Sequence, residues 1–162
     1  MSNMDIYMSG TFSITTDPLR HLVFVTLDGF FERARVEALR TALLDVRAGL
    51  SCPPNEHLML VDCSGMHIQS QEMVAAFTAA AREPTLRSRR AAVVVGKSLV
   101  NAQARRVFKL ERDHVSFFLD RHTAEEWLMI PPVSAVQTAS RYRRGPVLPM
   151  SVDRGYIARN GA

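Results

Sequence analysis

The sequence predicts an α/β domain on a mixed five-stranded sheet, with elements in the order ββαβαβαβα. Short apolar runs rich in β-branched residues alternate with longer segments of helical periodicity, as in parallel strands joined by helices. The first two runs are separated by only four residues, which fits a hairpin rather than a crossover. We therefore expect the first strand alone to run antiparallel and the remaining connections to be right-handed.

The N-terminal part of the domain predicts a hairpin followed by a helix. Residues 10–16 and 21–27 are the two strands, and the Asp17-Pro18 pair lies in the turn between them. Residues 31–48 have apolar side chains at helical spacing, and Gly49 is a natural end for this helix.

Two buried strands form the middle of the predicted sheet. Residues 57–62 and 91–96 are continuous apolar runs, as expected for strands that are covered on both faces. Between them, a polar stretch leads into an alanine-rich helix that begins after Ser70 and ends before Pro84.

The C-terminal part of the domain predicts a helix, an edge strand and a final helix. The helix covers residues 98–111 and the strand covers 115–120. The last helix begins at Thr123, because Thr123 and Glu126 have the spacing of a capping box.

Charge and composition divide the chain into a short extension at 1–9, a domain at 10–130 and a tail at 131–162. The net charge of +4 belongs entirely to the tail, which has five arginines and one aspartate and leaves the domain formally neutral. The tail is rich in proline and glycine, so we expect it to be extended or partly disordered, with packing only at its apolar residues 147–150. Its basic cluster is Arg141, Arg143 and Arg144.

Several classes of protein are disfavoured by the residues present. No apolar run is long enough to span a bilayer and no signal peptide is visible, so we expect a cytoplasmic protein. The two cysteines lack a CxxC spacing and the histidines lack metal-ligand spacing, which predicts free thiols, no metal and no cofactor. Gly96-Lys97-Ser98 is not a phosphate-binding loop, because position 91 is alanine instead of glycine. We therefore expect no enzyme.

The stretch DCSGMHIQSQE at 62–72 is the candidate functional site. Parallel strands expose their carboxyl ends at one edge of the sheet, and a helix N-terminus there can hold an anion or a phosphate. The same residues also fit a structural role, with Ser70 as the helix N-cap and Asp62 and Ser64 as turn formers. Candidate binding or switch residues are Asp62, Ser64, His67, Ser70, Glu72, Lys97 and Ser98.

The hairpin with its Asp-Pro turn, LMLVDCSGM, IQSQEMVAAF, VVVG and QARRVF resemble the SpoIIAA-like branch of the STAS domain superfamily over about residues 10–130. The resemblance implies a SpoIIAA-like fold and a bacterial, cytoplasmic regulatory module of the anti-sigma-factor-antagonist type. In these antagonists the strand ends in Asp-x-Ser, which Asp62 and Ser64 match. The following helix opens with an Asp-Ser-Ser-Gly signature whose serine is phosphorylated. Here Ser70 falls at or beside that serine, but the flanking aspartate and glycine are missing.

Two classes of function follow. The first is a non-enzymatic regulatory or protein-interaction module, with the helix N-terminus at Ser70 as the candidate sensor of an anion or small ligand. The second is a carrier of lipids or small apolar ligands, similar to CRAL-TRIO domains, with a pocket lined by phenylalanines: Phe30, Phe31, Phe77, Phe117 and Phe118. We expect a protein partner and a homodimer, with nucleic acid disfavoured because the domain is neutral. The expected dimer surface is an apolar face of the hairpin: Phe12, Ile14, Val23 and Val25.

Overall fold

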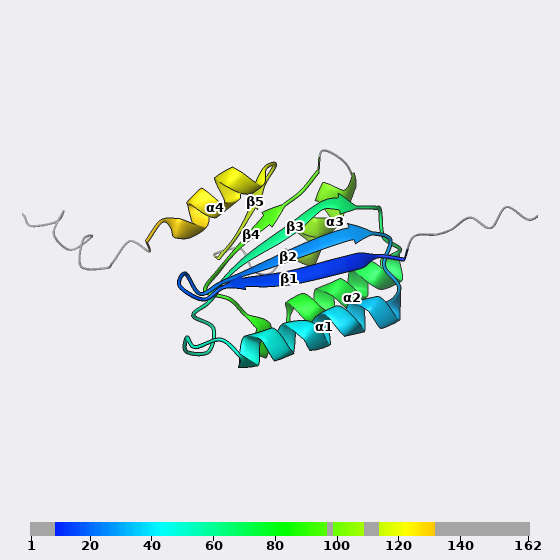
Figure 1. The fold of residues 1–162 in the computed structure, drawn as a ribbon. Coiled ribbons are helices and arrows are strands. Elements are labelled where there is room, and N and C mark those ends of the chain that lie inside the picture. Colours follow the sequence, from blue (N-terminus) through cyan, green and yellow to red (C-terminus); the bar gives the residue numbers. More distant parts are fainter. Residues whose placement is uncertain (1–8, 97–98, 109–113, 132–162) are drawn as a thin grey trace, which may run out of the picture. The chain divides into compact units, whose positions relative to one another are not determined.

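The computed structural model describes residues 9–96, 99–108 and 114–131, which form a mixed sheet covered by helices (Figure 1). The strands are β1 (Thr11–Asp17), β2 (Leu22–Gly29), β3 (Leu58–Met66), β4 (Arg90–Val94) and β5 (Val115–Phe118). The helices are α1 (Arg33–Ala48), α2 (Gln71–Ala81), α3 (Leu99–Val107) and α4 (Arg121–Met129), with a 3₁₀ turn at Pro84–Leu86.

The strands lie in the order β1-β2-β3-β4-β5, and only the β1–β2 pair is antiparallel. The predicted fold class, element order and single antiparallel strand are confirmed. Lys97, Ser98 and the tail cluster Arg141, Arg143 and Arg144 lie outside the described residues.

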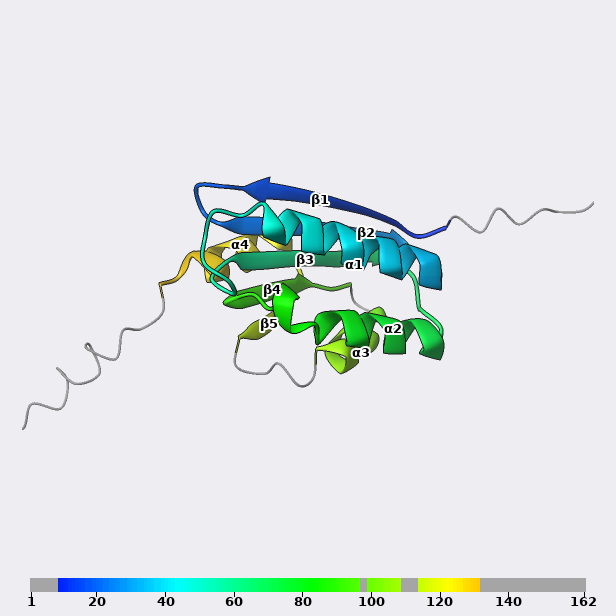
Figure 2. The same cartoon turned by 90° about the horizontal axis from the view of Figure 1, so that it is seen from below.

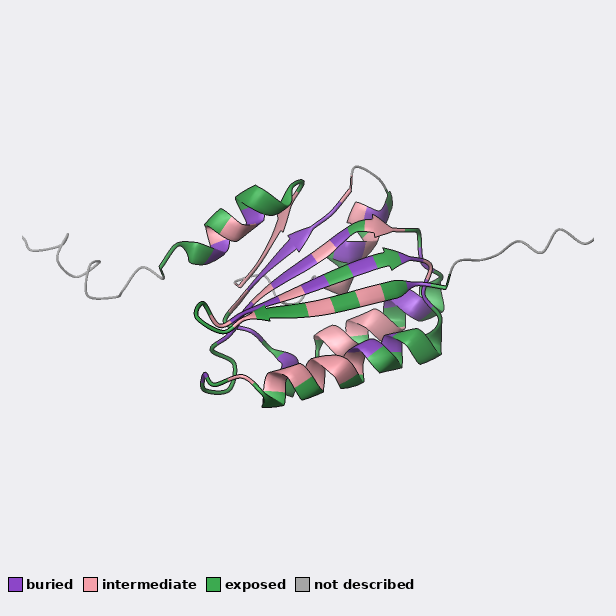
Figure 3. Cartoon of the chain, in the orientation of Figure 1, coloured by how far each residue is buried: buried purple, intermediate pink, exposed green. Residues whose placement is uncertain are grey.

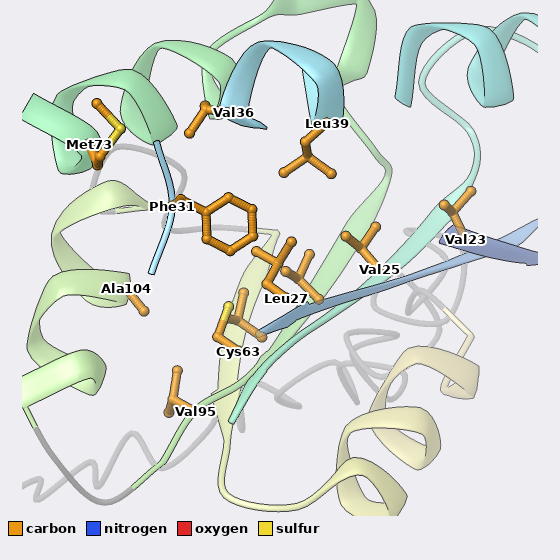
Figure 4. Packing of buried hydrophobic residues seen from close by; sticks show 12 residues of the cluster. Val23, Val25, Leu27, Phe31, Val36, Leu39, Cys63, Met73, Val95 and Ala104 are labelled. Atoms are coloured by element: carbon orange, nitrogen blue, oxygen red, sulfur yellow. The ribbon is translucent and has the colours of Figure 1, made fainter. Parts of the chain in front are cut away.

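The two faces of the sheet are covered differently. Helices α1, α2 and α3 lie on one face and α4 lies on the other (Figure 2). On the three-helix face, the fully buried ring of Phe31 packs among residues of α1 and the sheet, including Leu39 and Leu27 (Figure 4). On the opposite face, Ala124 and Leu128 of α4 pack on a second cluster that includes Leu60. Both faces thus bury apolar side chains, which is why the central strands read as continuous apolar runs.

The hairpin turn is held by Asp17, as its sequence predicts. One carboxylate oxygen accepts hydrogen bonds from the main-chain N–H groups of Leu19 (3.1 Å) and Arg20 (3.2 Å). The other accepts from the Arg20 guanidinium at 2.6 Å.

The prediction that the hairpin presents an open apolar face is wrong. Val23 and Val25 are buried on the face that α1 covers, and Phe12 and Ile14 pack against the same cluster. The Arg35 guanidinium lies over the Phe12 ring, 5.3 Å from its centroid. The physical reason is register: Phe12 pairs with Leu27 and Ile14 pairs with Val25, so these side chains share one face, and α1 packs on that face.

Two predicted boundaries are also corrected. β3 continues through the expected turn as far as Met66, because residues 62–66 still pair with β2. The last helix begins at Arg121, and its N-cap is Asp120 instead of Thr123. The Asp120 carboxylate accepts from the Thr123 N–H at 2.9 Å, so the chain enters the helix directly after β5.

The described helices include none that is long and apolar enough to cross a membrane.

Candidate functional site

A β-bulge in β3 shapes the first half of the candidate site. Thr26 pairs with Asp62 and Asp28 pairs with Gly65, so β3 has one more residue than β2 over this step. One oxygen of the Asp62 carboxylate accepts hydrogen bonds from the Ser64 N–H (2.9 Å) and from the Ser64 hydroxyl (2.6 Å). Asp62 and Ser64 therefore make the local hydrogen bonds that are typical of a turn, but these bonds stabilise a bulge within β3 instead of a turn after it.

Gly65 leaves room for the Asp28 carboxylate. A Cβ atom at position 65 would overlap this carboxylate on the neighbouring strand, so the observed conformation of the Asp28 side chain depends on the glycine. Asp28 and Asp62 lie on adjacent strands near the carboxyl edge.

Gln69 joins two connections at this edge, and the residue is only 6% exposed. The side-chain oxygen accepts from the Phe31 N–H at 2.8 Å. The side-chain nitrogen donates to the carbonyls of Gly29 (3.0 Å) and His67 (2.6 Å). The β2–α1 connection and the β3–α2 connection are thereby fixed to each other.

Gln103 of α3 completes this arrangement. Its oxygen accepts from the Gln69 main-chain N–H and its nitrogen donates to the Gln69 carbonyl, both at 2.8 Å. The side-chain amide of Gln103 therefore pairs with both main-chain groups of Gln69, as a residue of a neighbouring strand would. The residue immediately before the α2 N-cap is held from two sides, which fixes the position of the helix N-terminus.

Ser70 is the N-cap of α2, as the sequence predicts. Its hydroxyl accepts from the Met73 N–H at 3.2 Å, and the residue is exposed. Glu72 lies in the first turn and pairs with Arg33 of α1 at 2.8 Å. Both side chains of that ion pair are more than half exposed, so the pair contributes little to stability.

The candidate residues form two groups instead of one site. Asp62 shares its sheet face with Leu60 and Val94, the face that α4 covers in part. Ser70, Glu72 and the α2 helix belong to the opposite face. His67 lies between them in an exposed connection, where its N–H donates to the Gly29 carbonyl at 3.0 Å.

Exposed apolar side chains accompany Ser70 at the carboxyl edge. Ile68, which follows β3, is 52% exposed, and Leu99, at the start of α3, is 65% exposed. Leu119, which follows β5, is 62% exposed. The ends of three neighbouring strands thus each present an apolar side chain to solvent, beside the polar residues of the 62–72 stretch.

The chemistry of this edge does not favour catalysis. Burial, together with the nearby Asp62 charge, raises the pKa of the Cys63 thiol to about 12, so the thiol is neutral and a poor nucleophile. Within the described part of the chain, no three His, Cys, Asp or Glu side chains gather as metal ligands.

Sequence reasoning missed the importance of Gln69, Gln103 and Asp28. The partners of the Gln69 side chain include residues 38 and 40 positions away in the sequence, and Gln103 is 34 positions away. The signal available was a glutamine directly before a helix N-cap, which by itself resembles any polar loop residue.

The phenylalanines suggested for a ligand pocket do not surround one space. Phe31 and Phe77 pack edge to face on the three-helix side, with ring centroids 5.2 Å apart. Phe117 joins the cluster on that side, whereas Phe118 packs against Trp127 on the α4 side. Adjacent residues of a strand point to opposite faces, so these last two cannot line the same pocket.

Comparison with known proteins finds no matching family model and no matching curated protein. Solved structures of similar fold include the following two. One is an uncharacterized DUF3478-family protein with a SpoIIAA-like fold from Shewanella loihica PV-4, with 18% identity and a TM-score of 0.57 over 74% of this chain and 94% of that one. The other is an anti-sigma factor antagonist from Mycobacterium paratuberculosis, with 14% identity and a TM-score of 0.51 over 74% of this chain and 93% of that one. The chain therefore has the SpoIIAA-like fold that its sequence resemblance implied.

Proposed function

We propose that this chain is a non-enzymatic regulatory module that binds a protein partner through the carboxyl edge of its sheet, around the N-terminus of α2. The observation that carries the proposal is the Gln69–Gln103 arrangement, which holds an otherwise exposed connection in place. That connection presents Ile68 and Ser70 side by side to solvent. A preorganised surface with an exposed apolar residue and polar neighbours is suited to binding, because little ordering entropy is lost.

The fold supports the same class of function. One structure of similar fold is an anti-sigma factor antagonist. Fold similarity alone does not carry function, so the proposal depends on the surface described above. A cytoplasmic location and a protein partner remain part of this proposal.

The alternative of a lipid carrier has no support in the described residues. The pocket between the sheet and the three helices has a volume of about 140 Å³. Pockets for drug-sized ligands or cofactors measure roughly 300–1,000 Å³, so a long acyl chain does not fit.

The binding surface is tested by charge substitution at exposed apolar positions. The full chain, with Ile68→Asp or Leu99→Asp, is used for quantitative affinity capture from native lysate of the source cells. Leu19→Asp is the matched control, because Leu19 is 95% exposed but lies in the β1–β2 turn at the other end of the strands. We expect partners of the wild type to be depleted about tenfold or more with the edge variants and retained with the control. Equal partner profiles for all three variants would refute the proposed surface.

A regulatory role for Ser70 requires a separate test. As a cap, Ser70→Ala should cost about 1 kcal/mol, whereas Ser70→Asp should cost almost nothing, since aspartate caps well and suits the helix dipole. As a phosphorylation switch, Ser70→Asp should in addition lose or gain a partner relative to wild type, because it adds a negative charge at this surface. Partner profiles that are the same for wild type and Ser70→Asp would leave Ser70 as a cap alone.

A further inference from the structure

A pocket of about 140 Å³ lies between the sheet and its three covering helices. Its walls come from β2, β3, β4 and β5 on one side and from α1, α2 and α3 on the other. One end of the pocket, at His67, Gln69 and Gln103, borders the carboxyl edge of the sheet, but a ligand in the pocket does not require the proposed protein partner.

Small side chains explain why this space is not filled. α2 contributes Ala80 and Ala81 to the wall, and α3 contributes Ala104. Figure 4 shows the short Ala104 side chain directed from α3 toward Cys63 of the sheet. Several large apolar residues nearby are only partly buried, among them Leu43, Met59 and Phe77.

The walls of the pocket are mostly aliphatic and aromatic, including Val61, Val74 and Phe108. Fewer lining residues are polar: His67, Gln69, Arg87, Ser88, Gln103 and His114. The amides of Gln69 and Gln103 lie in the wall near the carboxyl edge, but both are already bonded to main-chain groups. Cys63 adds a buried neutral thiol, which behaves as a small apolar group.

Size then selects the kind of ligand. An apolar protein cavity of about 150 Å³ takes up benzene or xenon, whereas water does not enter it. A pocket of 140 Å³ with apolar walls fits a molecule of that size. We propose that this pocket binds a small apolar molecule, of the size and chemistry of a single unsubstituted or methyl-substituted aromatic ring.

The test uses thermal unfolding of the full chain with toluene as the probe and with a pair of leucine variants on one helix. Ala80→Leu places a larger side chain in the pocket wall, whereas Ala79→Leu places the same side chain on the exposed surface of α2. Ala104→Val is a smaller filling change from the opposite wall, in case leucine at position 80 prevents folding. Dodecanoate serves as the long-chain probe.

We expect near-saturating toluene to raise the melting temperature of wild type and of Ala79→Leu by a few degrees. The same toluene should have little effect on Ala80→Leu and on Ala104→Val, and dodecanoate should have no effect on any variant. No rise with wild type would overturn the proposal. An equal rise with both filling variants would place toluene elsewhere and would also overturn it, and a rise with dodecanoate would show that the ligand class is wrong.

Discussion

Replacing Gln69 by alanine removes three side-chain hydrogen bonds, two of which join the β2–α1 connection to the β3–α2 connection. The Phe31 N–H loses its acceptor at 2.8 Å, the His67 carbonyl loses the Gln69 donor, and the Gly29 carbonyl keeps only the main-chain N–H of His67. Each such bond contributes about 1 kcal/mol net, and an unsatisfied buried donor costs about 1–3 kcal/mol. We therefore expect the free energy of unfolding to fall by about 3 kcal/mol, a large part of the stability of a domain of this size.

Urea unfolding followed by circular dichroism measures this change as a lower midpoint at an unchanged slope. Gln71→Ala is the matched control, because Gln71 is exposed and lies two positions further along the chain. We expect it to change stability by less than about 0.5 kcal/mol. Gln103→Ala removes two bonds to the main chain of Gln69, so its expected cost is about 2 kcal/mol. A loss below about 1 kcal/mol for Gln69→Ala would refute the view that Gln69 fixes the α2 N-terminus.

Three further predictions concern pH, the tail and assembly. Burial, and to a lesser degree the Arg47 charge, lowers the pKa of His57 from 6.5 to about 4. The unfolded chain thus binds more protons between these values. The resulting stability is fully present above pH 6.5, and about 3 kcal/mol is lost as the pH falls through 4. In urea unfolding at several pH values, a His57→Gln variant should lose less unfolding free energy than wild type as the pH falls. An equal loss for the two proteins would contradict the prediction. Removing residues 132–162 should leave a folded, nearly neutral domain by circular dichroism, and an unfolded product would be the contrary result. Because α1 covers the apolar face of the hairpin, we expect the homodimer to form through the edge strand β1. Between Thr11 and Thr16 this strand has no lysine, proline or bulge that would prevent pairing with a second copy. Light scattering should give twice the chain mass of 18.1 kDa, and a monomer at tens of micromolar would contradict it.

Local signals in the sequence were sufficient for the elements and several of their ends. The Asp17 turn and the Ser70 cap both depend on bonds between residues two or three positions apart, so residue type alone predicts them. The last helix shows the limit of such signals. Asp120 and Thr123 are both good N-cap residues, and which of them begins the helix depends on where β5 ends.

Which side of the hairpin is covered was decided by the tertiary structure. The alternation of Phe12 and Ile14 with Thr11 and Ser13 predicts one apolar face, but it cannot tell whether a helix or a second chain covers that face. In the structure α1 packs there, and exposed residues alternate with partly buried ones along β1 (Figure 3).

The sequence by itself determined the order of strands and helices, the single antiparallel strand and the cap at Ser70, because periodicity and capping act over one or two turns of chain. Only the tertiary structure decided that Asp62 and Ser70 belong to opposite faces, that β3 bulges against Asp28, and that Gln69 joins two connections. These features depend on contacts between residues more than thirty positions apart. The free energy of such contacts is set by packing and burial, which no short stretch of sequence contains.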